Sequence, residues 1–156
     1  MSEERRGRLF LVAGADAAVR AEVATALARR SPLAIALDGT AFDAMVVTGR
    51  QVYAEPPSVS QLRQLFLRWS ASIATAETYL LEGFDAVISD AVLGSFLDDF
   101  LDLATPEPVH VVVLDDGRQT GTPGWGLWVP ASLPAEVIAA QVLADPDRAR
   151  VLTDAD

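Results

Sequence analysis

Residues Arg8 to Ala21 read RLFLVAGADAAVRA, and this stretch decides the fold. It opens on an unbroken apolar run, Leu9–Ala13, which is typical of a parallel strand that is covered on both faces. Gly14 follows as a turn residue, and Asp16 is placed to cap the helix that comes next. The stretch therefore predicts a buried strand, a short loop and a helix.

The rest of the chain repeats this alternation of short apolar runs with stretches of helical spacing. The predicted strands are 9–13, 33–37, 85–89, 109–114 and 126–129, and the predicted helices are 17–30, 58–82, 96–103 and 134–143. Such alternation implies right-handed crossovers between parallel strands. The sequence predicts a three-layer α/β/α domain with a five-stranded parallel sheet over residues 8–144. A flexible N-terminal tail (1–7) and an acidic C-terminal tail (145–156) are predicted to flank it.

Composition excludes several classes of function. The net charge of −10 argues against nucleic acid and anionic membranes as partners, because both select basic surfaces. The chain has no cysteine and a single histidine, His110, which lies within an apolar run and is expected to be a core residue. We therefore expect no metal site. The first apolar run is too short to span a membrane, so a cytoplasmic protein is expected. The lysine-free, arginine-rich usage indicates a bacterial source.

Acidic residues follow three of the predicted strands. Asp38 comes after the second strand, Asp90 after the third, and Asp115 and Asp116 after the fourth. Ligands of open α/β sheets bind beyond the carboxyl ends of the strands. Asp38 and Asp90 could accordingly bind Mg²⁺, act as a general acid and base, or cap strand-to-helix turns, and the sequence leaves these alternatives open.

The loop after the first strand stands where a phosphate-binding loop would read G-x-x-x-x-G-K-[ST]. Gly14 matches the first glycine, but Val19 replaces the second, Arg20 replaces the lysine and Ala21 replaces the hydroxyl that holds Mg²⁺. These four residues are predicted to form a vestigial phosphate loop, so we expect neither ATP nor Mg²⁺ as a cofactor. Arg20 is expected to be a solvated helix residue, with a phosphate contact as the alternative.

The order of these features resembles the small-molecule kinases of the P-loop superfamily, in particular the chloramphenicol phosphotransferase-like group. The resemblance covers about residues 8–144. It rests on the Gly14 loop, DGTAFDAMV from Asp38, Gly49-Arg50, the 62–79 helix with Arg63 and Arg68, GFDAVISD ending at Asp90, 109–114, and GLWV from Gly126. It implies that Asp38 lies near the acceptor hydroxyl and Asp90 near the metal and phosphates. In addition to the altered loop, the stretch 115–126 is too short for the kinase lid and holds one basic residue, Arg118.

The candidate site residues lie at the carboxyl edge of the predicted sheet. Asp38 and Asp90 are the candidates for any catalysis. The candidate ligand-binding residues are Asp43, Arg50, Arg68 and Trp125. We expect Asp38, Asp43, Asp90 and Trp125 to line one cleft that takes a polar, uncharged or cationic molecule. Each of these residues also has an ordinary structural alternative, as a cap, a surface charge or a packed side chain.

Three functions are consistent with this pattern. The first is a non-catalytic relative of a small-molecule kinase, a pseudokinase, that binds a small organic ligand or a protein partner. The second is an enzyme of different chemistry that uses Asp38 and Asp90 as acid and base. The third is an atypical ATP-dependent phosphotransferase in which Arg20 replaces the lysine. The loss of cationic groups favours the first, and whether the protein forms a homodimer stays open.

Overall fold

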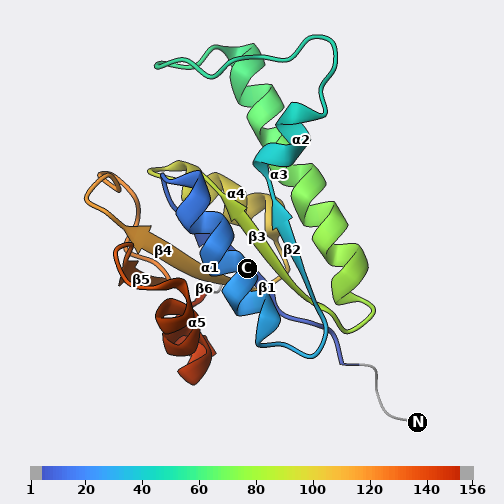
Figure 1. Cartoon of the computed structure of the whole chain (residues 1–156). Helices are drawn as coiled ribbons and strands as arrows, with labels where there is room; N and C mark the ends of the chain where they lie inside the picture. Colours follow the sequence, from blue (N-terminus) through green and yellow to red (C-terminus); the bar gives the residue numbers. More distant parts are fainter. Residues whose placement is uncertain (1–4, 152–156) are drawn as a thin grey trace.

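The computed structural model describes residues 5–151, which form one sheet with helices on both of its faces (Figure 1). Within these residues the elements in chain order are β1 (Leu9–Ala13), α1 (Ala17–Arg29), β2 (Ala34–Asp38), α2 (Thr40–Ala44), α3 (Val59–Leu80), β3 (Asp85–Asp90), α4 (Phe96–Ala104), β4 (Val109–Asp115), β5 (Leu127–Pro130), α5 (Ala135–Ala144), the 3-10 turn η1 (Pro146–Arg148) and β6 (Arg150–Val151).

The first five strands are parallel and lie in the order β2-β3-β1-β4-β5. This confirms the predicted α/β architecture. The structure adds a sixth strand, because β6 pairs antiparallel with β4, with Val151 beside Val109. A two-residue strand is too short to produce a periodic pattern, so it was not foreseen in the sequence. Residues 1–4 and 152–156 of the predicted tails lie outside the described residues.

The central strand β1 is buried along its whole length and separates two apolar layers. Leu9 and Leu11 pack with α3 and α4, whereas Phe10 and Val12 pack with α1 and α5. The alternation follows from the two-residue period of a strand. It explains why β1 shows no polar residues: both of its faces lie in the core.

The predicted helices are found within two residues of their expected ends, and one helix was missed. The long helix α3 begins after Ser58, whose hydroxyl accepts a bond from the backbone N–H of Gln61, while the Gln61 side chain bonds back to Ser58. The missed helix, α2, has only five residues and follows β2 directly. The segment 45–58 and the start of α3 project beyond the carboxyl edge of the sheet (Figure 1). No helix within residues 5–151 is long and apolar enough to cross a membrane.

His110 is a core residue, as expected. It is 7% exposed, stacks near the ring of Phe10 at 4.9 Å between centroids, and its Nδ1 lies 3.2 Å from the carbonyl oxygen of Leu9. A neutral imidazole protonated at Nδ1 donates this bond. Burial lowers the pKa of His110 below its usual value near 6.5, with the Leu9 carbonyl opposing the shift.

This lowered pKa predicts a loss of stability on mild acidification. As the pH falls through about 6.5, the unfolded chain takes up a proton that the folded chain resists, so the free energy of unfolding decreases. We expect the melting temperature to fall between pH 7.5 and 5.5, and to fall less in His110→Gln. Because the chain has one histidine, an equal pH response in both proteins would contradict this assignment.

Candidate functional site

The connection between β1 and α1 is short, and one of its own side chains already accepts hydrogen bonds from the N-terminus of α1. Only residues 14–16 separate the two elements, and Val19 lies within the helix. One carboxylate oxygen of Asp16 accepts bonds from the backbone N–H groups of Ala18 (2.9 Å) and Val19 (3.2 Å). A phosphate-binding loop would offer such free N–H groups to an anion. Here a carboxylate of the chain itself occupies the N-terminus of α1.

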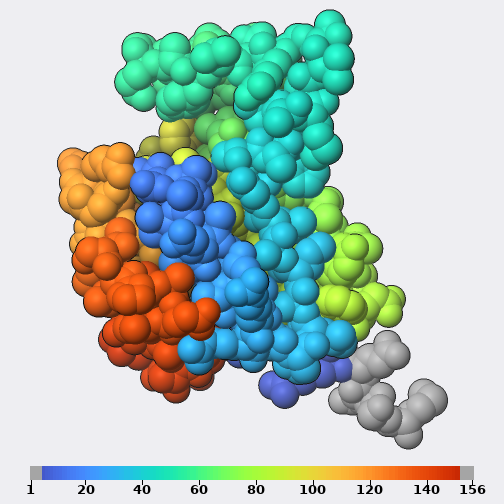
Figure 2. All heavy atoms as spheres, in the orientation of Figure 1, coloured from blue at the N-terminus to red at the C-terminus, as the bar shows by residue number. Residues whose placement is uncertain are grey.

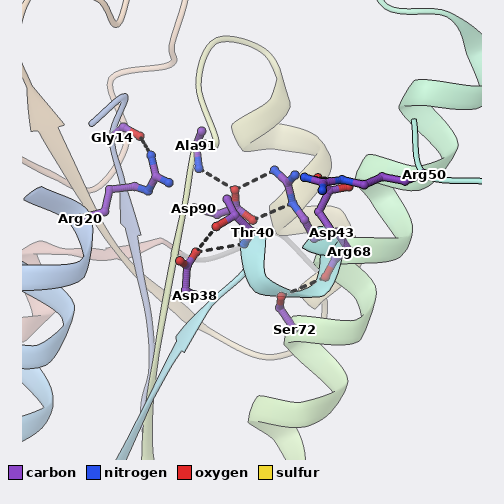
Figure 3. Close-up of polar contacts among 10 residues, drawn as sticks. All are labelled: Gly14, Arg20, Asp38, Thr40, Asp43, Arg50, Arg68, Ser72, Asp90 and Ala91. Atoms are coloured by element: carbon purple, nitrogen blue, oxygen red, sulfur yellow. Dashed lines mark hydrogen bonds and ion pairs between the residues drawn. The ribbon is translucent and has the colours of Figure 1, made fainter. Parts of the chain in front are cut away.

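Arg20 is buried, and the expectation of a solvated arginine is therefore wrong. Its side chain is on α1 and 3% of the residue is exposed. Nη1 donates a 2.8 Å bond to the carbonyl oxygen of Gly14, while Nε is buried without a partner among the described residues (Figure 3). Position 20 lies at helical three-four spacing from Val23, Ala24 and Leu27, so Arg20 is on the buried face of α1.

Asp90 is the last residue of β3, and its side chain forms an ion pair with Arg68 of α3. The Arg68 guanidinium binds both carboxylate oxygens, with Nη2–Oδ1 at 2.8 Å and Nε–Oδ2 at 3.1 Å, and the N–H of Ala91 donates a 2.7 Å bond (Figure 3). The Asp90 side chain is fully buried and that of Arg68 is 16% exposed. Burial raises the pKa of Asp90, and the bonds from Arg68 and Ala91 oppose this rise.

Gly39 makes room for this ion pair. A Cβ atom at position 39 would lie 2.1 Å from Oδ2 of Asp90, well inside van der Waals contact. The backbone N–H of Gly39 also donates to the carbonyl oxygen of Ser89 at 2.9 Å, which holds the end of β2 against β3. The turn after β2 therefore packs directly on the Asp90 carboxylate.

The remaining candidate residues of this corner form two exposed pairs. Asp38 accepts bonds from the backbone N–H of Thr40 (3.0 Å) and from its hydroxyl (2.6 Å), at the start of α2. Asp43 forms an ion pair with Arg50, with Nη2–Oδ2 at 3.0 Å. Figure 3 shows both pairs beside Asp90, so the structure brings together five of the predicted site residues at one corner of the sheet. Each acid there already has a partner within the chain.

Trp125 comes from the other side of the sheet edge. Its loop precedes β5, and β3, β1 and β4 lie between β5 and the strand that carries Asp38. Trp125 is 42% exposed, and its backbone carbonyl oxygen accepts a 3.1 Å hydrogen bond from the indole N–H of Trp128. Trp125 is thus separated from the corner that holds Asp38 and Asp90.

The loop at residues 115–126 is held by hydrogen bonds and an ion pair between its own residues. Arg118 forms an ion pair with Asp116. The buried side chain of Gln119 accepts a hydrogen bond from the backbone N–H of Asp116 and donates one to the Asp116 carboxylate. The bonds from Arg118 and Gln119 lower the pKa of Asp116 to about 2. The single cation of this loop is therefore engaged within the loop. Gln119 has no sequence signal of its own, because its role depends on how the loop folds.

The projecting segment 45–58 is braced by two glutamines of α3. Gln64 donates to the carbonyl oxygen of Gly49 (2.6 Å) and accepts from the N–H of Gln51, while Gln61 donates to the carbonyl oxygen of Val52 (2.6 Å). Figure 2 shows that this segment overhangs the body of the molecule and leaves a hollow beneath it. Among residues 5–151, no three His, Asp or Glu side chains are grouped so as to hold a metal ion.

Comparison with known proteins finds kinases of the same fold. No family model matches the chain, and no curated protein matches it in sequence. The APS kinase of Mycobacterium tuberculosis is 15% identical with a TM-score of 0.67, and covers 89% of this chain and 96% of its own. An unliganded sugar kinase from a Janibacter species is 15% identical with a TM-score of 0.61, covering 92% and 96%. A gluconokinase from Sinorhizobium meliloti is 14% identical with a TM-score of 0.56, covering 91% and 92%. At this level of identity the likeness establishes the fold alone, and the chain has the α/β fold of the P-loop kinases.

Proposed function

We propose that this chain is a kinase-like protein without ATP-dependent phosphotransfer, which binds a small organic ligand or a partner beside the carboxyl edge of its sheet. The observation that carries the proposal is the Asp16 carboxylate on the N-terminus of α1. In kinases of this fold the triphosphate needs that N-terminus, and a carboxylate there takes its hydrogen bonds and repels its charge.

The cationic groups near the loop support the same proposal. Catalysis of phosphoryl transfer depends on positioned positive charge around the transferred group. Arg20 is buried against Gly14, Arg68 is bound to Asp90, and Arg118 is bound to Asp116. Using any of them for a phosphate would first break an internal contact, and two of those contacts are ion pairs. The fold is therefore kept while the groups that neutralise phosphate are committed elsewhere.

The nature of the ligand follows from which polar groups stay reachable. Asp38 is exposed, and the Asp43–Arg50 pair is half in solvent beside it. The hollow under the 45–58 segment opens at this end of the molecule (Figure 2). An exposed carboxylate favours a hydroxylated or cationic molecule over a phosphorylated one.

One observation favours a second candidate, an enzyme with acid–base chemistry. Burial raises the pKa of Asp90, which is the property a general acid needs. The same burial removes Asp90 from contact with a substrate, since the side chain is fully covered and bound by Arg68. We therefore rank binding ahead of acid–base catalysis. An activity whose pH profile changes in Asp90→Asn would reverse that order.

The proposal predicts that Mg²⁺-ATP and Mg²⁺-GTP bind no more tightly than millimolar in isothermal titration. The reason is the occupied N-terminus of α1, so the triple variant Val19→Gly, Arg20→Lys, Ala21→Ser should also show no ATP turnover while Asp16 and the short lid remain. An active P-loop kinase titrated in the same buffer is the control. Micromolar, Mg²⁺-dependent binding to the natural chain would overturn the proposal.

A further inference from the structure

The exposed side of α3 carries large apolar residues that nothing among the described residues covers. Val59 is 73% exposed, Leu67 is 62% exposed and Leu81, at the end of the helix, is 61% exposed. A helix that packs on one face of a sheet normally carries polar residues on the opposite face. In Figure 1 α3 lies at the margin of the molecule, beside the sheet.

A groove of about 370 Å³ runs along the first half of this face. Its lining is mainly apolar and comes from α3 alone: Val59, Leu62, Arg63, Phe66, Leu67 and Ser70. Arg63 is exposed in the groove and has no ion-pair partner among residues 5–151. The groove therefore combines apolar surface with one free positive charge.

The face continues as a straight stripe to the end of the helix. At 3.6 residues per turn, its members lie within about 60° of Ser70 around the axis. We call these residues the α3 stripe: Val59, Arg63, Leu67, Ser70, Ala74, Glu77 and Leu81. With a rise of 1.5 Å per residue, the stripe is about 33 Å long. Small residues, Ser70 and Ala74, occupy its middle.

The stripe is complementary to itself when reversed. Arg63 and Glu77 stand at equal distances on either side of Ser70, and so do Val59 and Leu81. Two antiparallel copies that cross at Ser70 would bring Arg63 of each copy to Glu77 of the other, and Val59 to Leu81. Such a contact obeys the two-fold symmetry of a dimer, in which each patch meets its own copy. A parallel arrangement would instead oppose like charges.

We infer that the α3 stripe is a homodimer interface, in which α3 packs antiparallel against α3 of a second copy of this chain. The inference does not depend on whether nucleotide binding is lost. The small residues at the crossing point let the two helices approach closely, and Leu67 of each copy packs beside Ala74 of the other. A helix pair is small compared with the roughly 800 Å² that each partner buries in a stable complex, so the dimer should dissociate in the micromolar range.

Sedimentation equilibrium of the full chain between about 1 and 200 μM tests the inference. We expect a reversible dimer that is weakened about tenfold by Arg63→Glu or by Glu77→Arg, because each change opposes like charges at two symmetric places. The combined variant, Arg63→Glu with Glu77→Arg, restores both pairs in the opposite sense. It should recover the affinity of the natural chain.

Two controls separate the interface from general effects. Arg29→Glu reverses an exposed charge on α1 and should leave the association unchanged. Leu67→Asp should abolish the dimer, whereas Val137→Asp, at a 41% exposed position on α5, should not. Circular dichroism confirms that each variant is folded. A chain that stays monomeric at 200 μM overturns the inference. A dimer that ignores both charge reversals, or that the combined variant fails to restore, overturns it equally.

Discussion

Replacing Arg68 with methionine should lower the free energy of unfolding by about 3–5 kcal/mol, the usual cost of removing one partner of a buried ion pair. The Asp90 side chain is fully buried, and Arg68 supplies two of the three hydrogen bonds that its carboxylate receives. Methionine retains most of the packing of the arginine stem but leaves the carboxylate with the Ala91 N–H alone. Urea unfolding at pH 8 measures the loss.

The pH response of this variant identifies the cause. Without Arg68, desolvation should raise the pKa of Asp90 further above its unfolded value near 3.9. As the pH falls through that raised pKa, the folded state binds a proton before the unfolded state does, so Arg68→Met should regain part of its lost stability. The control is Arg29→Met on α1, outside the proposed dimer interface, where an exposed arginine should contribute less than about 0.5 kcal/mol.

A double variant tests whether the charge of Asp90 is the source of the lost stability. Asp90→Asn removes the charge but keeps an acceptor for the Ala91 N–H, so the pair Arg68→Met with Asp90→Asn should be more stable than Arg68→Met alone. Equal stability of the single and double variants would show that α3 loses packing, and that the charge of Asp90 is not the source of the loss.

The fold could be predicted because its strands are short, apolar and covered on both faces. Leu9–Ala13 and Val109–Asp115 contain runs that only a two-sided core explains, and the capping residues Asp16 and Ser58 mark the helix starts. The two elements that were missed, α2 and β6, have five and two residues. Elements of that length are produced by the surrounding structure and leave no periodic pattern in the sequence.

The site could be predicted in position but not in chemistry. Asp38 and Asp90 each follow a parallel strand, and adjacent parallel strands end at the same edge of a sheet. Their position at one corner could therefore be predicted. The partners of these acids could not be predicted. Arg68 is far from Asp90 in the sequence, and the ion pair between them depends on where α3 crosses the sheet. Arg20 shows the same limit: α1 begins where the sequence predicts, but the burial of Arg20 depends on the Gly14 carbonyl oxygen lying within reach of its guanidinium, which the sequence does not show.

These pairings change how the acidic corner is understood. Retained carboxylates at a ligand edge can indicate a binding site, but a carboxylate that is fully bonded inside the protein also joins elements together. Asp90 links β3 to α3, and Gly39 packs on it from the turn after β2. The corner is therefore a structural joint as well as the border of the hollow, and substitutions there should affect stability before they affect binding.

Gly39→Ala should destabilise the protein by about 1–3 kcal/mol, the cost of adding a methyl group to a packed interior. The new Cβ would lie 2.1 Å from Oδ2, 2.9 Å from Cγ and 3.3 Å from Cβ of Asp90. Because the nearest atoms belong to a carboxylate that Arg68 and Ala91 hold in place, the side chain cannot turn away without losing those bonds. The backbone at Gly39 is ordinary for any residue, with φ −59°, so the effect comes from the collision. Gly124→Ala is the control, since nothing lies within 4 Å of its added Cβ, and its stability should be unchanged or slightly increased. Chemical denaturation of both variants is then repeated in an Asp90→Ala background, where the obstructing carboxylate is gone. There Gly39→Ala should cost less than it does in the natural chain, and an undiminished cost would place the collision elsewhere than at the Asp90–Arg68 pair.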